Sequence, residues 1–340
     1  MLNKISGNVH VGNDLLRYYH KVFAKIVVLF MIIPLLQPSL SFAGLTSGFS
    51  FLNTDFAPRS AAMGSAFITM RGDLNTLGLN PAGLASVGDR SFIFNYTHYL
   101  LDINGGQAAY SFTAPYLKRV GVAVTYMDYG SFEATDQYAV PTGATFTAHD
   151  FALTLSQAGH LDKHFSYGVS LKYAFSQIEE YTAQAVAFDF GLLYAVPFQK
   201  DLYWAVTLLN TGWNVKKYGS IKEPLPTTLN VGFSKKLAHL PLEISVMWHG
   251  LNRDSEKWFN RFERFSAGGE LTLSKHLRLR LGYNHTLHQD LETNSTAQGN
   301  FGGVSGGLAI YWKSFRFDYA FSNMQDLGNI HRFGISGRIR

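Results

Sequence analysis

Ser305 has the sequence neighbours most similar to those of a catalytic nucleophile. Gly303, Ser305 and Gly307 fit the pattern G-x-S-x-G, which in hydrolases places a serine on a sharp turn between a strand and a helix. The residues from Leu308 to Tyr311 predict another strand instead of a helix. We therefore interpret the glycines and the serine as small residues on one face of a strand.

Two histidines, His285 and His288, are spaced as metal ligands can be. A zinc site takes at least three protein ligands, and no third candidate stands near them in the sequence. The chain has no cysteine, which excludes thiol chemistry and thiolate metal sites. We interpret both histidines as loop residues and predict neither a metal nor a cofactor.

Charged residues inside otherwise apolar or small-residue segments form the third group. Two carboxylates can act as general acid and base, but here both signs of charge fall on the same face of the predicted strands. Mixed charges favour salt bridges, so we predict a polar network facing the inside of the fold. Its members are Lys172, Asp189, Glu243, Arg278, Arg280, Arg316 and Asp318.

The segments that must position these residues show a period of two. Tyr167, Val169 and Leu171, for example, alternate with Gly168 and Ser170, as in strands with two unlike faces. The alternation predicts fourteen strands, near residues 90–100, 105–113, 119–128, 149–158, 165–176, 185–195, 201–210, 227–236, 241–250, 262–273, 276–286, 301–311, 314–323 and 329–339.

The connections between these strands alternate in length. Short links follow the even-numbered strands, and most links after odd-numbered strands are longer, at 129–148, 177–184, 211–226, 251–261 and 287–300. Outer-membrane barrels have this pattern of short periplasmic turns and longer outer loops. We predict an all-β fold, a 14-stranded antiparallel transmembrane β-barrel over residues 90–340. A soluble β-sandwich is the alternative, but its solvent face would carry many Lys and Glu, whereas Gly, Ala, Ser and Thr dominate here.

The composition agrees with a protein that contacts lipid. Charged residues make up 16% of the chain and aromatic residues 15%, against about 25% charged residues in soluble domains. The formal net charge is +5, of which residues 1–43 contribute +3, leaving +2 for the rest. Since no element carries clustered Lys and Arg, we expect no nucleic-acid partner.

Residues 1–43 have the order of a secretory signal. Lys21 and Lys25 precede the apolar stretch 26–36, and Ser41-Phe42-Ala43 predicts cleavage between Ala43 and Gly44. The apolar stretch is shorter than the roughly 20 residues that span a bilayer. We expect an exported protein, located in a bacterial outer membrane and in contact with its lipid.

Residues 44–89 do not alternate and precede the first strand. Asn80-Pro81 predicts a helix start, because Asn caps free amides and Pro fits the first helical position; Gly88 would end the helix. We predict that this segment folds back into the barrel as a plug, since a barrel of this width needs filling. A periplasmic tail is the alternative, although the segment is too apolar for a disordered linker.

Motifs in this segment resemble those of a known family. They are Phe51-Leu52, Ala57-Pro58-Arg59-Ser60-Ala61-Ala62-Met63-Gly64, Gly72-Asp73 and Asn80-Pro81-Ala82-Gly83-Leu84-Ala85, followed by Asn95-Tyr96 and Tyr129-Gly130-Ser131-Phe132. In these the chain resembles PorV/PorQ outer-membrane barrels of the type IX secretion system, and Ser234 to Pro241 look more like PorQ. The resemblance implies that Arg59, Met63, Gly64, Asp73, Asn80, Pro81 and Ala82 form a plug motif. The Asn-Pro-Ala element is shared with FadL-type barrels.

The resemblance implies a non-enzymatic anchor for the cell-surface attachment complex, with the sortase PorU, the shuttle PorV and the surface protein PorZ as partners. We expect docking on outer loops through Phe132, Trp213, Lys217, Tyr218, Trp258 and Phe259, although aromatic girdles also occur without any partner. Two alternatives stay open. One is a FadL-like channel for hydrophobic compounds. The other is a lipid hydrolase with a serine and a histidine on the lipid-facing rim.

Overall fold

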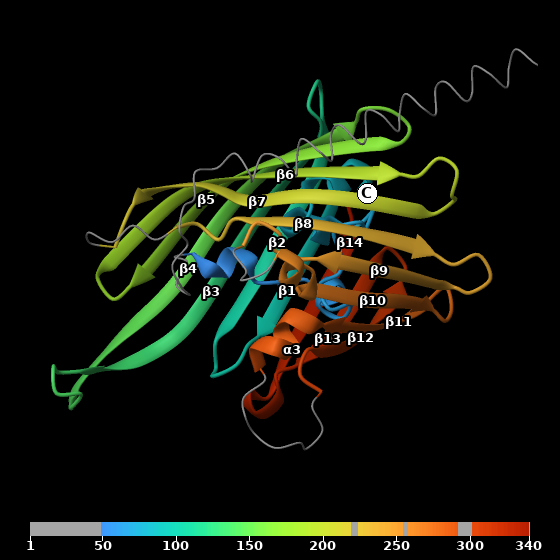
Figure 1. Cartoon of the computed structure of the whole chain (residues 1–340). Coiled ribbons are helices and arrows are strands. Elements are labelled where there is room, and N and C mark those ends of the chain that lie inside the picture. The colour runs from blue at the N-terminus through green and yellow to red at the C-terminus, as the bar shows by residue number, and fades with distance from the viewer. Residues whose placement is uncertain (1–48, 219–223, 254–257, 292–300, 340) are drawn as a thin grey trace, which may run out of the picture. The chain divides into compact units, whose positions relative to one another are not determined.

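Fourteen antiparallel strands form a closed barrel in the computed structural model, which describes residues 49–218, 224–253, 258–291 and 301–339. Each strand pairs with the next along the chain, and β1 pairs with β14 to close the sheet (Figure 1). The predicted fold class is confirmed. The strands are β1 Ser91–His98, β2 Asn104–Ala114, β3 Lys118–Thr135, β4 Pro141–His160, β5 Phe165–Ile178, β6 Tyr181–Ala195, β7 Leu202–Lys216, β8 Thr228–Lys236, β9 Leu242–Trp248, β10 Phe265–Thr272, β11 Leu277–Asn284, β12 Val304–Trp312, β13 Phe315–Asn323 and β14 Asn329–Arg338.

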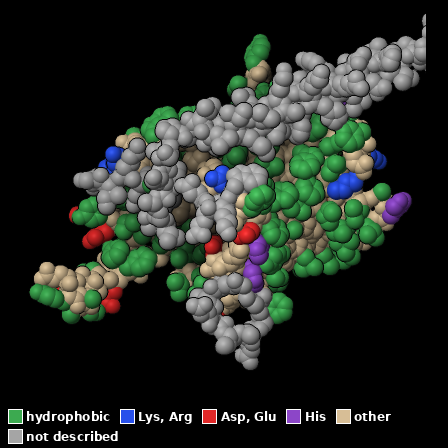
Figure 2. Space-filling view, viewed as in Figure 1, with side chains coloured by type: hydrophobic (Ala, Val, Ile, Leu, Met, Phe, Trp, Pro, Cys, Tyr) green, Lys and Arg blue, Asp and Glu red, His purple; other side chains and the backbone are tan. Residues whose placement is uncertain are grey.

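The period of two separates an apolar outer face from a small and polar inner face. On β5, Leu171 and Tyr173 are exposed, whereas Lys172 and Ala174, which alternate with them, are buried. Figure 2 shows hydrophobic side chains gathered over the outer face of β9–β11. A closed sheet pairs all of its strands, so this apolar face can meet hydrocarbon without unpaired backbone groups. Within the described residues, no helix combines the length and hydropathy of a membrane-spanning helix.

Two predicted loops are instead strand hairpins. β3 and β4 continue through most of 129–148, with Ser131 opposite Thr147 and the rings of Phe132 and Phe146 stacked at 5.4 Å between centroids. β5 and β6 occupy most of 177–184. Both sides of the β3–β4 extension are largely exposed, so its side chains need not alternate in polarity. The alternation of apolar and polar residues therefore stops where one face of the strands is no longer buried, although β3 and β4 remain paired beyond that point.

Three other predicted links contain regular structure. β7 extends to Lys216, η5 Trp258–Glu263 lies at the end of the link after β9, and α3 His285–Leu291 follows β11 directly. The short helix η6 Gln325–Leu327 connects β13 to β14. We call the end of the barrel with the β3–β4 hairpin and α3 the hairpin end. The opposite end, with short links such as 273–276 and 313–314, is the turn end.

The segment before β1 lies inside the barrel, in blue in Figure 1. It contains η2 Ser50–Asn53, α2 Pro58–Ala61, η3 Leu74–Gly78 and η4 Pro81–Ser86, and most of its residues from Phe56 to Leu84 are buried. Because it contacts strands all round the wall, from β3 to β14, it can only occupy the lumen. We call residues 49–89 the plug. The predicted leader and its cleavage site between Ala43 and Gly44 lie outside the described residues.

The predicted helix start in the plug is confirmed in a tighter form. The side chain of Asn80 accepts a hydrogen bond of 2.9 Å from the amide of Ala82, with Pro81 at the first helical position. The helix is a 3₁₀-helix and ends at Ser86, two residues before Gly88. The Asn80 amide also donates to the Ile68 carbonyl oxygen at 2.6 Å. One side chain thus fixes two turns of the plug.

Glycines in the barrel wall allow the plug backbone to lie close to the wall. A Cβ at Gly168 would lie 2.2 Å from the carbonyl carbon of Pro81, and one at Gly268 would lie 2.3 Å from the carbonyl oxygen of Met63. A Cβ at Gly282 would lie 2.1 Å from the amide nitrogen of Gly64. Any larger residue at these three inward positions would displace the plug backbone.

Candidate functional site

Arg59 joins the plug to the barrel wall in a cluster of seven buried or half-buried charges. Its Nε and Nη2 donate to the two carboxylate oxygens of Glu270 on β10, each at 2.8 Å, and its Nη1 donates to Asp73 of the plug at 2.8 Å. Bidentate guanidinium–carboxylate pairs are the most directional ion pairs in proteins. The Arg59 side chain is 8% exposed and that of Glu270 is 4% exposed, so solvent screens the pair little.

Strands β11 and β13 complete this cluster. Arg280 donates to Glu270 at 2.7 Å and to Asp318 at 2.6 Å, and Arg278 donates to Glu270 at 2.9 Å. Arg316 contacts Asp318 at 2.6 Å and Asp73 at 2.9 Å. Four of these seven side chains, Arg278, Arg280, Arg316 and Asp318, belong to the network expected from the sequence. We call the seven residues the ionic cluster.

Asp73 stays ionised because two cations face it. Burial by itself raises the pKa of a carboxyl group, but the guanidinium groups of Arg316 and Arg59 outweigh that effect and hold the pKa of Asp73 well below its usual value. The second oxygen of Asp73 accepts the amide of Asn75 and so caps η3. The plug is therefore both shaped and anchored by this carboxylate.

The other predicted network residues lie in two separate groups. Lys172 of β5 contacts Asp189 of β6 at 2.8 Å and donates to Asn210, whose amide donates to Asn53 of the plug at 2.8 Å. Glu243 of β9 pairs with Arg71 of the plug at 2.9 Å. The single network expected from the sequence is thus three groups, and each of them reaches the plug.

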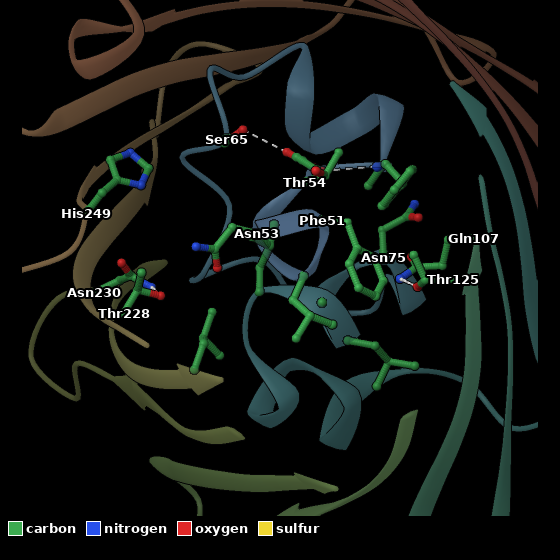
Figure 3. Close-up of a pocket in the computed structure, with 18 of the residues that line it drawn as sticks. Phe51, Asn53, Thr54, Ser65, Asn75, Gln107, Thr125, Thr228, Asn230 and His249 are labelled. Carbon is green, nitrogen blue, oxygen red and sulfur yellow. Dashed lines mark hydrogen bonds between the residues drawn. The ribbon is translucent and has the colours of Figure 1, made fainter. Parts of the chain in front are cut away.

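Two cavities lie on the hairpin side of the plug. The first has a volume of about 220 Å³ and lies between the plug residues 51–57 and the wall. In Figure 3, Asn53 points toward the side of this cavity that carries His249, Thr228 and Asn230, while Phe51 lies nearer to Gln107 and Thr125. The second cavity, of about 470 Å³, shares Phe51, Asn53 and Asp55 with the first and is bounded by Tyr99 and Met127. Together they form what we call the outer chamber.

A third cavity opens at the turn end. It measures about 450 Å³ and is lined by Asp73, Leu74 and Val87 of the plug and by Phe92, Arg316 and other wall residues. Asn75 and Leu77 line the outer chamber, whereas Asp73 and Leu74 line this cavity. The helix η3 therefore separates the two spaces.

The serine and histidine candidates have structural partners. Ser305 lies on β12, is buried, and accepts a hydrogen bond of 3.1 Å from the amide of Gly64; no sharp strand-to-helix turn follows it. His285 and His288 stack with ring centroids 6.1 Å apart, and His288 contacts the carbonyl oxygen of Gly302. Among the described residues, no group of three or more His, Cys, Asp or Glu is placed to hold a metal. Ser305 lines the lumen, away from the rim position that the lipid-hydrolase hypothesis requires.

The residues expected to contact partners differ in their positions. Phe132, Trp213, Lys217 and Phe259 are exposed at the hairpin end, and Trp258 begins η5. Tyr218 is half-buried, unlike the exposed side chains of this set. Its hydroxyl donates to Ser176 at 2.6 Å, and its ring packs against a buried cluster that includes Phe51.

Sequence reasoning missed Glu270 and Arg71. Glu270 lies on β10 among small residues, and a single charged residue in such a strand does not by itself predict an ion pair. The register pairs it with Arg280 on β11 and Glu243 on β9, and this register is the signal that could have placed it in the network. Arg71 lies between the motif residues Gly64 and Asp73 and offers no sequence signal of its own.

Comparison with known proteins gives matches at the level of fold. No protein-family model and no curated protein matches the sequence. The toluene transporter TbuX of Ralstonia pickettii superposes with a TM-score of 0.58 at 13% identity, over 85% of this chain and 100% of that one. The monoaromatic hydrocarbon channel CymD gives a TM-score of 0.52 at 10% identity, over 84% and 98%. A FadL homologue of Pseudomonas aeruginosa gives 0.50 at 10% identity, again over 84% and 98%. The chain thus has the barrel fold of FadL-like outer-membrane transporters.

Proposed function

We propose that the protein is an outer-membrane barrel that admits a small, partly apolar molecule to its outer chamber and passes it inward past the plug. The observation that carries this proposal is the outer chamber itself, whose mixed lining of Phe51, Leu209 and Met247 with Asn53 and Asn230 suits such a ligand. The apolar outer face of the barrel and its likeness to TbuX and CymD support a place in the outer membrane.

In this proposal the hairpin end faces the exterior and the turn end faces the periplasm, as the lengths of the links predict. A ligand in the outer chamber meets η3, which separates it from the cavity at the turn end. Passage therefore requires a shift of the plug, and the ionic cluster is the contact that resists this shift.

Uptake through an intact outer membrane tests the proposal. The gene is expressed in a Gram-negative host that lacks its own FadL-type channels, and the entry of labelled toluene is compared with that in the same host carrying an empty vector. We expect faster entry with the protein present. Equal rates, with the folded barrel verified in the outer membrane, would overturn the proposal.

A second candidate is the attachment role that the PorV/PorQ resemblance implies. The observation that favours it is the set of exposed aromatic side chains at the hairpin end, Phe132, Trp213 and Phe259, of which Phe132 stacks on Phe146 in the projecting hairpin. Partners would be PorU-, PorV- and PorZ-like proteins of a type IX system. Surface proteomics of a deletion strain tests it: loss of displayed cargo supports this role, and normal display contradicts it.

A further inference from the structure

The cavity at the turn end extends over the edge of the barrel wall. Its lining residues come from both faces of β1, β13 and β14. Ile93 and Arg316 face the lumen, whereas their sequence neighbours Phe92 and Phe315 face outward. Since neighbouring residues on a strand point to opposite faces, a cavity that both faces line lies where the strands end. It therefore reaches from the lumen to the outer face of the barrel.

The lining of this cavity is positively charged. Its cations are Lys313, Arg316 and Arg338, and Asp73 is the one carboxylate among its described lining residues. Asp73 already pairs with Arg59 and Arg316. No carboxylate of the described residues lies within 4.0 Å of the Lys313 ammonium or the Arg338 guanidinium. An anion that enters the cavity can therefore pair with these two cations.

The two cations belong to different sides of the wall. The Arg338 guanidinium covers Gly88 at the end of the plug so closely that a Cβ would not fit there. The Lys313 ammonium lies 4.8 Å from the centre of the Trp312 ring, which is 57% exposed on the outer face. Tryptophan and lysine at the end of a membrane strand are typical of the head-group region. The cavity thus lies between the plug and the membrane interface.

Arg316 adds positive charge from the inside. Its Nε and Nη1 contact Asp318 at 2.6 Å and Asp73 at 2.9 Å, while its Nη2 is buried and has no hydrogen-bond partner among the described residues. In the ionic cluster, four guanidinium groups face three carboxylates. The cluster therefore keeps one positive charge in excess, which favours an anion in the adjoining cavity.

The outward part of the lining is aromatic. The rings of Phe92 and Phe315 meet edge to face with their centroids 6.3 Å apart. Gly337 of β14 pairs with both residues, and a Cβ there would lie 3.0 to 3.1 Å from the two rings. The glycine thus lets the rings close over β14. A ligand that suits both parts of the cavity has an anionic head group and apolar chains.

We propose that this cavity binds the phosphodiester head group of a phospholipid from the periplasmic leaflet. Lys313 and Arg338 bind the phosphate, and Phe92 and Phe315 contact the acyl chains near the glycerol. Arginine and lysine are common phosphate ligands, and basic pockets of membrane proteins bind anionic head groups. The volume of about 450 Å³ exceeds what a phosphate ion alone would fill. The inference uses the proposed orientation of the barrel and concerns a bound lipid, not the transported molecule.

Native mass spectrometry of the full chain, released from detergent micelles, tests the site. Phosphatidylglycerol and diacylglycerol with the same acyl chains are the matched probes, because they differ only in the phosphoglycerol head group. We expect one phosphatidylglycerol per chain, bound at least tenfold more tightly than diacylglycerol. Lys313→Gln and Arg338→Gln should each weaken its binding about tenfold, as expected for loss of a charged hydrogen bond. Lys275→Gln is the control, since Lys275 lies in the neighbouring turn at the same end but does not line the cavity.

Each outcome supports or overturns the lipid site. Equal binding of the two lipids overturns it, and so does phosphatidylglycerol binding that resists both substitutions in variants with the heat-modifiable gel mobility of a folded barrel. Inorganic phosphate should not displace the lipid at equal concentration; displacement would show a site for a free anion and overturn the lipid assignment. Should Arg338→Gln not fold, Lys313→Gln in its exposed turn still decides. No arm measures uptake, so a failed lipid site leaves the proposed function intact.

Discussion

Arg59 and Glu270 stand 211 residues apart in the chain and share two hydrogen bonds of 2.8 Å inside the barrel. Arg59 belongs to the plug and Glu270 to the wall, so the pair is a direct link between the segment that closes the lumen and the sheet that forms it. Glu270 is at the same time the shared partner of Arg278 and Arg280. Any change at this carboxylate therefore affects three cations.

Glu270→Gln should loosen the plug. The substitution leaves buried guanidinium groups without a counter-charge, which costs about 3 to 5 kcal/mol when one partner of a buried pair is removed. Hydrogen exchange of residues 58–86 should accelerate while the barrel strands stay protected. Glu243→Gln is the control, because its pair with Arg71 is more exposed and should contribute much less. Equal exchange in both variants would contradict the assignment of Glu270 as the main anchor.

Gly268→Ala should displace the plug, whereas Gly269→Ala should not. The new methyl group at position 268 would lie 2.3 Å from the backbone of Met63, while the one at position 269 meets a Leu242 methyl group at 3.3 Å, which can move. Overpacking against backbone costs about 1 to 3 kcal/mol. The two variants differ by one position on the same strand, so a similar thermal stability and plug exchange in both would refute the close approach described for Gly268.

A disulfide between plug and wall should block uptake. The hydroxyl oxygens of Thr69 in the plug and Ser245 on β9 are 3.4 Å apart, and cysteine places its sulfur where these oxygens lie. The chain has no native cysteine, so Thr69→Cys with Ser245→Cys creates a single possible bridge. We expect the oxidised double variant to lose toluene uptake and to recover it on reduction, with both single variants active. Unchanged uptake in the oxidised form would show that the plug need not move at this point.

Acid should release the plug only at low pH. The pKa of Asp73 is lowered in the folded state by Arg316 and Arg59 against the opposing effect of burial, so the stabilisation is fully present above the unfolded pKa of about 3.9. It is lost as the pH falls from there toward the lower folded pKa. Protease sensitivity of the plug should be constant from pH 7 to 5 and rise below about pH 4. Asp73→Asn should reduce this dependence without abolishing it, because Glu270 is a second carboxylate of the ionic cluster that acid can neutralise. A transition already complete at pH 5 would assign the effect to another group.

The strands could be predicted because the alternation of apolar and polar residues is a local property of each strand. Alternation within a few residues places Leu171 outside and Lys172 inside, whatever the rest of the chain does. The β3–β4 extension escaped prediction because neither of its faces is buried, so no period marks it.

The site was less predictable because it depends on register between distant segments. Arg280 was assigned to a polar network, but its partner Glu270 becomes evident only from their pairing across β10 and β11. A shift of one residue in that pairing would turn one of the two side chains to the outer face. The half-buried position of Tyr218 could not be predicted for a similar reason, since only the course of the chain after β7 shows that its hydroxyl reaches Ser176.

The plug's contacts also impose an order on folding. Three hydrogen bonds join the plug to late parts of the chain. Arg59 bonds to Glu270, the Gly64 amide to Ser305 across 241 residues, and the Asp55 carbonyl oxygen to Arg332 across 277 residues. Contacts of such sequence separation form late, because the entropy of closing the intervening chain must first be overcome. The plug must nevertheless lie inside the forming barrel before β1 pairs with β14, because that pairing closes the sheet around it. The plug, although it precedes every strand in the sequence, is thus the last part to reach its final contacts. The pairing of β1 with β14 then encloses it.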